Sequence, residues 1–148
     1  MSEIFGPNVT FTPDLEGVKA MYEQDRSLRL LGITITRVEQ DLIEGEMTVT
    51  AEMCNGFNTA QGGILFTFAD ALFAGACNGR SETPTVASQV SIHFLSPGKL
   101  GAKLRGLARQ TRTWGRNGIT DVTIFDGERV VAEFRGMSRT TARLPTEK

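Results

Sequence analysis

The sequence contains a single histidine, His93, and only two cysteines among its 148 residues. Cys54 and Cys77 do not form a CxxC pair, which excludes a zinc ribbon and a thioredoxin-like redox motif. One histidine cannot supply a His-rich metal site, so we expect neither a metal nor another cofactor. Two cysteines are too few for a disulfide scaffold, which favours reduced thiols and a cytoplasmic location. Any catalytic mechanism must therefore work almost without imidazole.

The sequence also lacks a large excess of positive or negative charge. The 16 Lys and Arg residues nearly balance the 17 Asp and Glu residues, which argues against a nucleic-acid partner because such a partner needs a basic face. The most apolar stretch, Gly62 to Cys77, is shorter than the roughly 20 residues that cross a bilayer, so no membrane partner is expected. The length predicts a single domain over 1–148, with a flexible arm at 1–13 and a tail at 141–148.

Hydrophobic periodicity predicts an α+β fold. Apolar residues recur at helical spacing from Asp14 to Leu31, and Gly32 is expected to end that helix. The segment from Gln61 to Asn78 is apolar on nearly every side, which indicates a buried helix. Alternating patterns predict two strands around a turn at Gln40–Asp41, and later strands over 85–95, 102–113, 119–125 and 129–140. A curved antiparallel sheet wrapped around the long central helix buries both elements, which is the hotdog arrangement.

Asp70 is the only charged residue in the range 53–79. An ionised carboxylate in apolar surroundings costs on the order of several kcal/mol unless it is paired or reaches water. No Lys or Arg lies three or four residues away on the same helix face, where the side chains are Phe66, Thr67, Phe73 and Ala74. A purely structural carboxylate is the alternative, but these surroundings favour a functional one.

Gln61-Gly62-Gly63 stands where the buried helix should begin. Free N–H groups gather at a helix start, glycines let a ligand oxygen approach them, and such a start can stabilise an oxyanion. Gly62 and Asp70 are about 12 Å apart along a helix axis, too far to act on one group. Two antiparallel copies of the helix across a two-fold axis bring Asp70 of one chain close to Gly62 of the other. If both act on one substrate, the active unit is at least a homodimer.

The order Asn55, Gln61-Gly62-Gly63, Asp70 and Pro97 resembles the hotdog-fold acyl-CoA thioesterases. In particular, CNGFNTAQGGILFTFADALFAGACN is similar to the central motif of the PaaI-like group associated with phenylacetate degradation, in which Asn is followed by His-Gly-Gly and Asp. The segments SIHFLSPGKLG and VAEFRGMSR also resemble that group. The resemblance implies hydrolysis of an acyl-CoA substrate, with a phenylacetyl or hydroxyphenylacetyl type of acyl group. It also implies a homodimer, or a homotetramer built as a dimer of dimers.

The resemblance further places four residues in the catalytic site, including Gln61, and implies roles for three of them. Asp70 is the general base that activates water, or the nucleophile that attacks the thioester carbonyl. The Gly62 N–H holds the oxyanion, and Asn55 orients the water or the thioester. The chain departs from the group at Gln61, where His is usual. Gln forms hydrogen bonds but does not titrate near neutral pH, so this difference bears on the rate more than on the reaction type.

Several further residues are candidates for binding the acyl part of the substrate. Gly63 lies at the same helix start as Gly62. Ser88 is the only polar member of the strand face that alternation assigns to Val86, Ser88, Val90, Ile92 and Phe94. Its hydroxyl either faces the buried helix near Asp70 or bonds to the backbone. His93 falls on the opposite face and is expected at the surface or a subunit contact. Four phenylalanines could line an acyl pocket or simply pack in the core: Phe57, Phe66, Phe68 and Phe73.

The polar turn at 114–118 and nearby arginines are candidates for binding coenzyme A. Arg suits phosphate groups, and in similar thioesterases this strand region lines the CoA groove. The candidates are Arg112, Gly115, Arg116, Asn117 and Arg139.

Two other functions stay open at this point. A non-enzymatic acyl-CoA-binding or sensing module would bind the thioester without turnover. A hotdog hydratase or dehydratase is less favoured, because that chemistry usually pairs a His with a carboxylate and His93 lies on a different element from Asp70.

Overall fold

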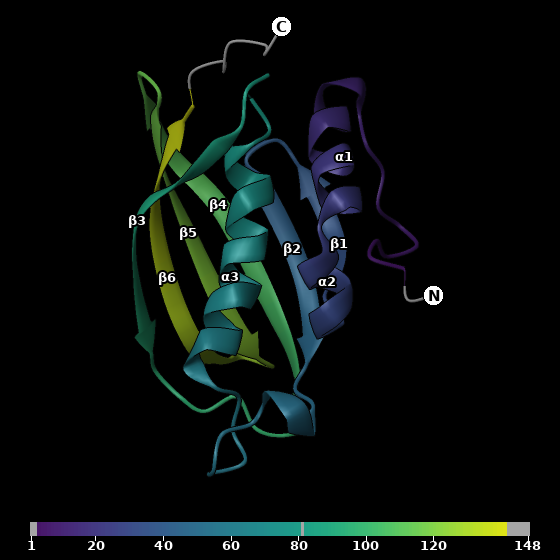
Figure 1. Ribbon diagram of the computed structural model, residues 1–148, viewed down its shortest axis with the longest axis vertical. Coiled ribbons are helices and arrows are strands. Elements are labelled where there is room, and N and C mark those ends of the chain that lie inside the picture. The colour runs from purple at the N-terminus through teal and green to yellow at the C-terminus, as the bar shows by residue number, and fades with distance from the viewer. Residues whose placement is uncertain (1–2, 81, 142–148) are drawn as a thin grey trace, which may run out of the picture.

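The computed structural model describes residues 3–80 and 82–141. A curved antiparallel sheet wraps around one long helix, α3 (Gly62–Cys77), as Figure 1 shows. The sheet has the order β1-β2-β4-β5-β6-β3, and every neighbouring pair is antiparallel. Its strands are β1 (Thr34–Glu39), β2 (Leu42–Thr48), β3 (Thr85–Phe94), β4 (Lys103–Trp114), β5 (Asn117–Asp126) and β6 (Arg129–Thr140). The expected α+β hotdog fold is confirmed.

Glycines in the sheet set the position of α3. A Cβ on Gly45 would lie 2.7 Å from Leu72 Cδ2, and one on Gly106 would lie 2.3 Å from Leu72 Cδ1. A methyl group at either position would push the helix away from the sheet, because interiors are close-packed. The close approach buries the whole sheet-facing side of α3, including Phe68 and Leu72.

The single helix expected from Asp14 to Leu31 is broken. The structure has a 3-10 turn, η1 (Pro13–Leu15), then α1 (Glu16–Gln24) and α2 (Arg26–Leu31). Asp25 interrupts them with φ −83° and ψ 103°, and its carboxylate accepts a hydrogen bond from Ser27 N at 2.9 Å. The hydrophobic periodicity does not reveal this break. The Asp25 side chain caps α2 and bonds to a backbone N–H that has lost its helical partner, so the chain can break here at little cost. Gly32 ends α2 with φ 64°, as expected.

The turns follow the sequence signals with one difference. The turn between β1 and β2 lies at Gln40–Asp41, as predicted, and Asp41 adopts φ 64° there. The five-residue turn expected at 114–118 is shorter, since β4 runs to Trp114 and β5 begins at Asn117. Gly115, with φ 54°, supplies the left-handed backbone that lets two residues reverse the chain.

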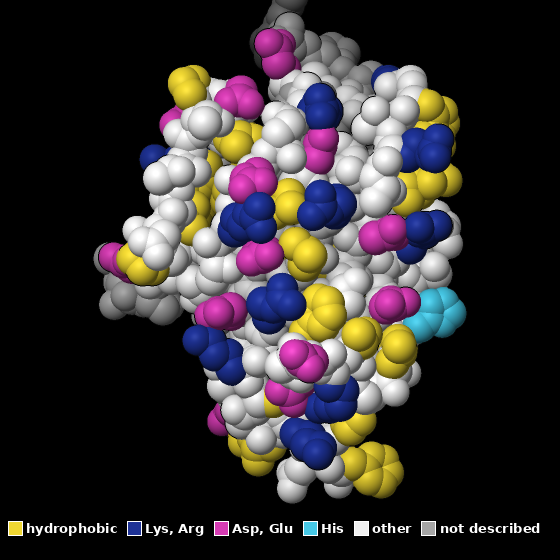
Figure 2. Space-filling model, turned by 180° about the vertical axis from the view of Figure 1, so that it is seen from behind, with side chains coloured by type: hydrophobic (Ala, Val, Ile, Leu, Met, Phe, Trp, Pro, Cys, Tyr) yellow, Lys and Arg dark blue, Asp and Glu magenta, His cyan; other side chains and the backbone are white. Residues whose placement is uncertain are grey.

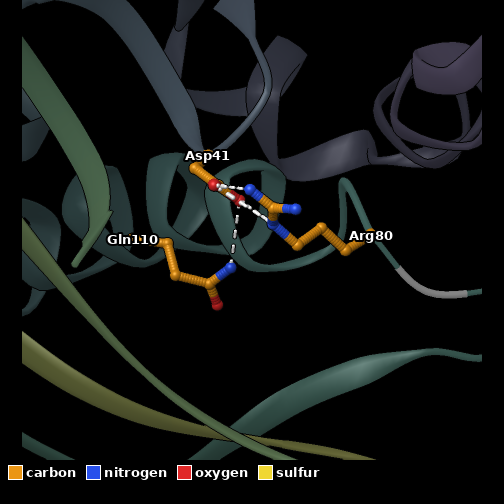
Figure 3. A network of polar contacts seen from close by, with 3 residues as sticks. All are labelled: Asp41, Arg80 and Gln110. Atoms are coloured by element: carbon orange, nitrogen blue, oxygen red, sulfur yellow. Dashed lines mark hydrogen bonds and ion pairs between the residues drawn. The ribbon is translucent and has the colours of Figure 1, made fainter. Parts of the chain in front are cut away.

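The segment that follows α3 is fixed to the sheet by Arg80. Its guanidinium forms a two-pronged ion pair with Asp41, with Nε to Oδ1 at 2.9 Å, and Gln110 Nε2 donates to the same carboxylate at 3.2 Å (Figure 3). These three residues join the β1–β2 turn, β4 and the chain leading to β3. They therefore hold the start of β3 near the C-terminal end of α3.

The two edges of the sheet differ. Within 1–13, the segment expected to be a flexible arm, residues 4–6 lie along β1: Gly6 N donates to Ile35 O at 2.8 Å, Ile35 N donates to Ile4 O at 2.7 Å, and Ile4 is buried. In the part of the chain that the structure describes, β3 is paired only with β6 and leaves its other side open. Most of the expected tail, residues 142–148, lies outside the described residues.

The outer face of the sheet carries charges of both signs. Figure 2 shows Lys and Arg side chains alternating with Asp and Glu side chains over this face, and they form ion pairs such as Arg135–Asp121 at 2.6 Å and Lys103–Glu46 at 3.1 Å. This face therefore has no continuous basic surface. Among the helices described, none is long and apolar enough to cross a membrane.

Candidate active site

The start of α3 presents free backbone N–H groups. Gln61 O accepts hydrogen bonds from Ile64 N at 2.9 Å and Leu65 N at 3.2 Å, and the Gln61 side chain makes no cap. Within the described chain, no acceptor is bonded to the N–H of Gly62 or Gly63. A Cβ on Gly62 would lie 3.1 Å from the Phe94 ring, whereas the space at Gly63 is open. The start of α3 can therefore donate hydrogen bonds to a ligand oxygen.

Asn55 holds the loop before α3 in shape. Its Oδ1 accepts hydrogen bonds from Phe57 N at 2.9 Å, Thr59 N at 3.4 Å and Thr59 Oγ1 at 3.2 Å. This use of the side-chain oxygen is typical of Asx turns. If Asn55 also orients water or a thioester, its amide N–H₂ is the group that remains to do so.

A groove of about 420 Å³ begins at the start of α3. Asn55 and Gly62 line it together, with Phe94 from the end of β3 and Pro97 from the chain after it. The structure therefore brings two of the predicted catalytic residues, Asn55 and Gly62, to one groove. Pro97, which belongs to the same sequence motif, also lines this groove. Asp70 is absent from the described residues that line it, as its position two turns along the same helix requires.

Asp70 lies on the side of α3 that faces away from the sheet. It is half-buried, and no described residue forms a hydrogen bond or an ion pair with its carboxylate. Burial raises the pKa of Asp70, and the negative charge of Asp25 raises it further. A carboxylate with a raised pKa and no partner is a better base than an ordinary aspartate.

Asp25 was not identified by sequence reasoning, because it lies on another element and is 45 positions away in the chain. It comes close to Asp70 because α1 packs on α3. The hydroxyl of Tyr22 donates to Ala71 O at 2.9 Å, and a Cβ on Gly75 would lie 2.1 Å from that hydroxyl. Only the tertiary structure could reveal this carboxylate neighbour.

We expect Asp25→Asn to move the acid limb of the kcat/KM–pH profile to lower pH. Removing the Asp25 charge lowers the pKa of Asp70, so its carboxylate is ionised at lower pH, whereas the larger effect of burial stays. Asn is as good a helix cap as Asp, so α2 should be retained. The measurement is the profile of thioester hydrolysis at low and high salt. An acid limb that does not move at low salt, where charges are least screened, would contradict the coupling.

A β-bulge changes the predicted face of β3. The register shifts between Ala87 and Gln89, so Ser88 has no partner residue, and its hydroxyl donates to Met137 O at 3.2 Å. Val86 consequently lies opposite Arg139, so the prediction that Val86 lies on the inner face is wrong. Beyond the bulge, Val90 and Ile92 pack on the core and His93 is exposed, as expected. Of the two alternatives for Ser88, the structure shows the backbone hydrogen bond.

The four candidate phenylalanines have different environments. Phe68 and Phe73 are buried in the core, and Phe73 packs against Phe134 with ring centroids 5.6 Å apart. Phe66 is 36% exposed on the open face of α3, and Phe57 is 89% exposed on the loop that Asn55 holds. Phe57 and Phe66 are therefore the two that a ligand or another chain can contact directly.

The candidate CoA residues lie on two faces of the sheet. Gly115, Arg116 and Asn117 line a groove of about 300 Å³ that also contains Cys77 and Ser138. Because Ser138 points inward and is buried, the next residue, Arg139, points to the outer face, where its Nη1 donates to Asn117 Oδ1 at 3.4 Å. Arg112, next to the groove residue Thr113, is exposed on that outer face too. The structure thus does not gather the arginines, and their role stays a prediction.

Other chemistry finds little support in the site. Burial raises the pKa of the Cys77 thiol to about 12, which makes it a poor nucleophile. Within residues 3–80 and 82–141, no group of three His, Cys, Asp or Glu side chains is placed to hold a metal ion.

Comparisons with known proteins show the family of the chain. Residues 57–133 match the model of the Thioesterase superfamily. The acyl-coenzyme A thioesterase PaaI of Escherichia coli is 39% identical over 124 residues, which cover 83% of this chain and 88% of that protein. The solved structure of E. coli PaaI has a TM-score of 0.83 at 37% identity, and covers 87% of this chain and 94% of its own. A mutant of the phenylacetic acid degradation protein PaaI from Thermus thermophilus has a TM-score of 0.76 at 26% identity, over 79% of this chain and all of that one. The chain therefore belongs to the thioesterase superfamily and is a thioester hydrolase with the hotdog fold.

Proposed function

We propose that the protein hydrolyses acyl-CoA thioesters, with an aromatic acyl group of the phenylacetyl or hydroxyphenylacetyl type. The single observation that carries this proposal is the unpartnered Asp70 carboxylate on the open face of α3, whose start offers the free Gly62 N–H. The relationship to E. coli PaaI, which is named an acyl-coenzyme A thioesterase, supports the same substrate class.

The proposal requires a homodimer, because one chain cannot bring Asp70 and Gly62 to one carbonyl. The open side of β3 supports this assembly, since the regular stretch beyond the bulge offers unpaired backbone groups to a second strand. Phe94, which is about half exposed, would be covered in the same step. A dimer of dimers is compatible with this arrangement but is not required by it.

The two-fold axis is expected to pass close to Phe66. In antiparallel helices that pair Gly62 with Asp70, the residue midway between these two positions faces its own copy. Phe66 is that residue, and it is exposed on the open face of α3. A large apolar side chain at this point suits a helix–helix contact better than solvent.

The mechanism follows from the pairing of the two groups. Asp70 accepts a proton from a water molecule as the water oxygen attacks the thioester carbonyl, and the partner's Gly62 N–H stabilises the resulting oxyanion. Collapse of this intermediate breaks the carbon–sulfur bond, the proton held by Asp70 passes to the departing thiolate, and the carboxylic acid and CoA are released. In the alternative route, the Asp70 carboxylate attacks the carbonyl itself and displaces CoA, and water then hydrolyses the mixed anhydride.

A hydrolysis screen tests the proposed reaction. Aromatic and aliphatic CoA thioesters are incubated with the protein, and the released CoA thiol is detected. We expect turnover, with a preference for phenylacetyl-type thioesters. Binding of these thioesters without release of thiol would overturn the proposal in favour of a sensing module.

Mixing two inactive variants tests whether each site spans two chains. Asp70→Asn and Gly62→Pro chains are mixed and allowed to exchange subunits. Half of the dimers are then mixed, and each mixed dimer has one intact site out of two, so about a quarter of the wild-type activity should return. A mixture no more active than the separate variants, with exchange confirmed by two different tags, would contradict the shared site.

A further inference from the structure

A second groove, of about 540 Å³, lies along the C-terminal half of α3. It is bounded by residues of α1, α3 and the start of β3. Its apolar lining consists of Met21, Ala74, Pro84 and Val86. The volume is within the usual range of small-molecule pockets.

The groove continues the helix face that carries Asp70. Residues four apart lie on one face of a helix, so Asp70, Ala74 and Asn78 are aligned. Ala74 and Asn78 both line the groove. Asp70 precedes Ala74 by four residues, about 6 Å along the helix axis. A group attached to a carbonyl at Asp70 therefore reaches the groove directly.

The walls of the groove are held in place before any ligand binds. Tyr22 is fully buried, and its hydrogen bond to Ala71 O ties α1 to α3. On the other side, Asn78 Nδ2 donates to Thr85 O at 2.9 Å, and Asn78 Oδ1 accepts from Thr85 N at 2.9 Å. These contacts fix α1 and the start of β3 against the same helix. Binding of a ligand therefore costs little additional conformational entropy in the walls of the groove.

The charge of the groove selects against anions. Its charged lining residues are Asp25 and Glu82, and Lys and Arg are absent from the lining that the structure describes. The phosphate groups of CoA are therefore disfavoured here, and so is an acyl group that ends in a carboxylate. An uncharged apolar acyl group meets Met21, Ala74, Pro84 and Val86 without this penalty.

We propose that this groove binds the acyl group of the substrate and selects uncharged, apolar acyl groups. The assignment rests on the proposed function, because it places the thioester carbonyl at Asp70. From there the acyl group extends past Ala74 towards Val86, and CoA extends along the partner's groove that begins at Gly62.

The second chain closes the groove. In the proposed dimer, the loop before the partner's Gly62 continues past Asp70 towards the C-terminal half of α3, because the two helices are antiparallel. The partner's Phe57, exposed on that loop, then lies opposite Ala74 and covers the acyl group. This arrangement explains why a large aromatic side chain is held out into solvent in the single chain.

Filling the groove from its α3 wall tests the assignment. With Ala74→Phe, kcat/KM for phenylacetyl-CoA should fall at least about tenfold, whereas kcat/KM for acetyl-CoA should change less than about twofold. The matched control is Ala20→Phe, which adds the same ring to an exposed position of α1 outside the groove lining. If Ala74→Phe does not fold, the smaller Ala74→Leu is expected to change the ratio in the same direction. Wild-type protein should also prefer phenylacetyl-CoA over glutaryl-CoA by about tenfold or more.

The outcomes separate the two proposals. If folded Ala74→Phe leaves the phenylacetyl-to-acetyl ratio unchanged while Asp70→Asn is inactive, the acyl group binds elsewhere and only the groove assignment fails. Equal use of glutaryl-CoA and phenylacetyl-CoA would overturn the charge selection. If folded Asp70→Asn hydrolyses both thioesters at the wild-type rate, the proposed role of Asp70 fails, and with it the placement of the carbonyl on which the groove assignment rests. If the wild-type protein binds both thioesters without releasing thiol, the proposed function itself fails.

Discussion

Asp70→Asn is expected to lower kcat/KM for CoA thioesters by about a thousandfold, whatever the acyl group. The amide keeps the shape of the carboxylate but can neither accept the proton of the attacking water nor act as a nucleophile. Asp70 has no described hydrogen-bond or ion-pair partner whose loss would disturb the fold. The measurement is steady-state release of CoA thiol, with substrate binding followed separately.

The same substitution should raise thermal stability at neutral pH. Because burial and then the charge of Asp25 raise the pKa of Asp70, the ionised carboxylate disfavours the folded state above that pKa. An uncharged amide removes this cost. The gain should disappear at low pH, where the carboxyl is protonated in both the folded and the unfolded chain. Melting temperatures across pH provide the measurement.

Asp14→Asn is the matched control for both effects, because Asp14 is exposed in η1 and far along the chain from α3. It should leave activity and its pH dependence unchanged. Full activity of folded Asp70→Asn would show that another group performs the chemistry.

Gly62→Pro is expected to lower kcat by about a hundredfold to a thousandfold, with a smaller effect on substrate binding. Proline removes the one N–H that the mechanism assigns to the oxyanion. The backbone accepts this change, since proline is favoured at the first position of a helix, and Gln61 already has φ −57° and ψ 141°, which suits a residue before proline. The helix should therefore remain intact.

Gly62→Ala separates the lost N–H from added bulk. It keeps the N–H but places a Cβ 3.1 Å from the Phe94 ring, so it reports the steric effect alone. The comparison of kcat between the two variants gives the contribution of the N–H. If Gly62→Ala and Gly62→Pro lose activity equally, the oxyanion is held by another donor, and the free N–H of Gly63 is the first to test.

The patterns in the sequence were enough to predict the fold class, the buried helix and the strands that surround it, and they supplied the candidate residues of the site. The apolar run at 61–78 could only be a buried helix, and alternating strands could only wrap around it, because these patterns leave one way to bury both. The isolated charge at Asp70 and the glycines at its helix start singled out the residues to which the proposal assigns the chemistry. The eight-residue separation of Gly62 and Asp70 also predicts two chains if both groups act on one substrate, since helix geometry fixes that distance.

The tertiary structure decided what depends on contacts between elements distant in the chain. The Asp25 cap breaks the first helix, and the packing of Tyr22 on α3 brings that carboxylate to Asp70. The bulge at Ser88 reverses which residues of β3 face inward before and after it. The alternation of residue types cannot predict this, because the extra residue of a bulge has no signature in the composition of the strand. The groove at Ala74 exists only because α1, α3 and the start of β3 meet there. Local periodicity encodes which face of an element is buried, but not which side chains of other elements it meets.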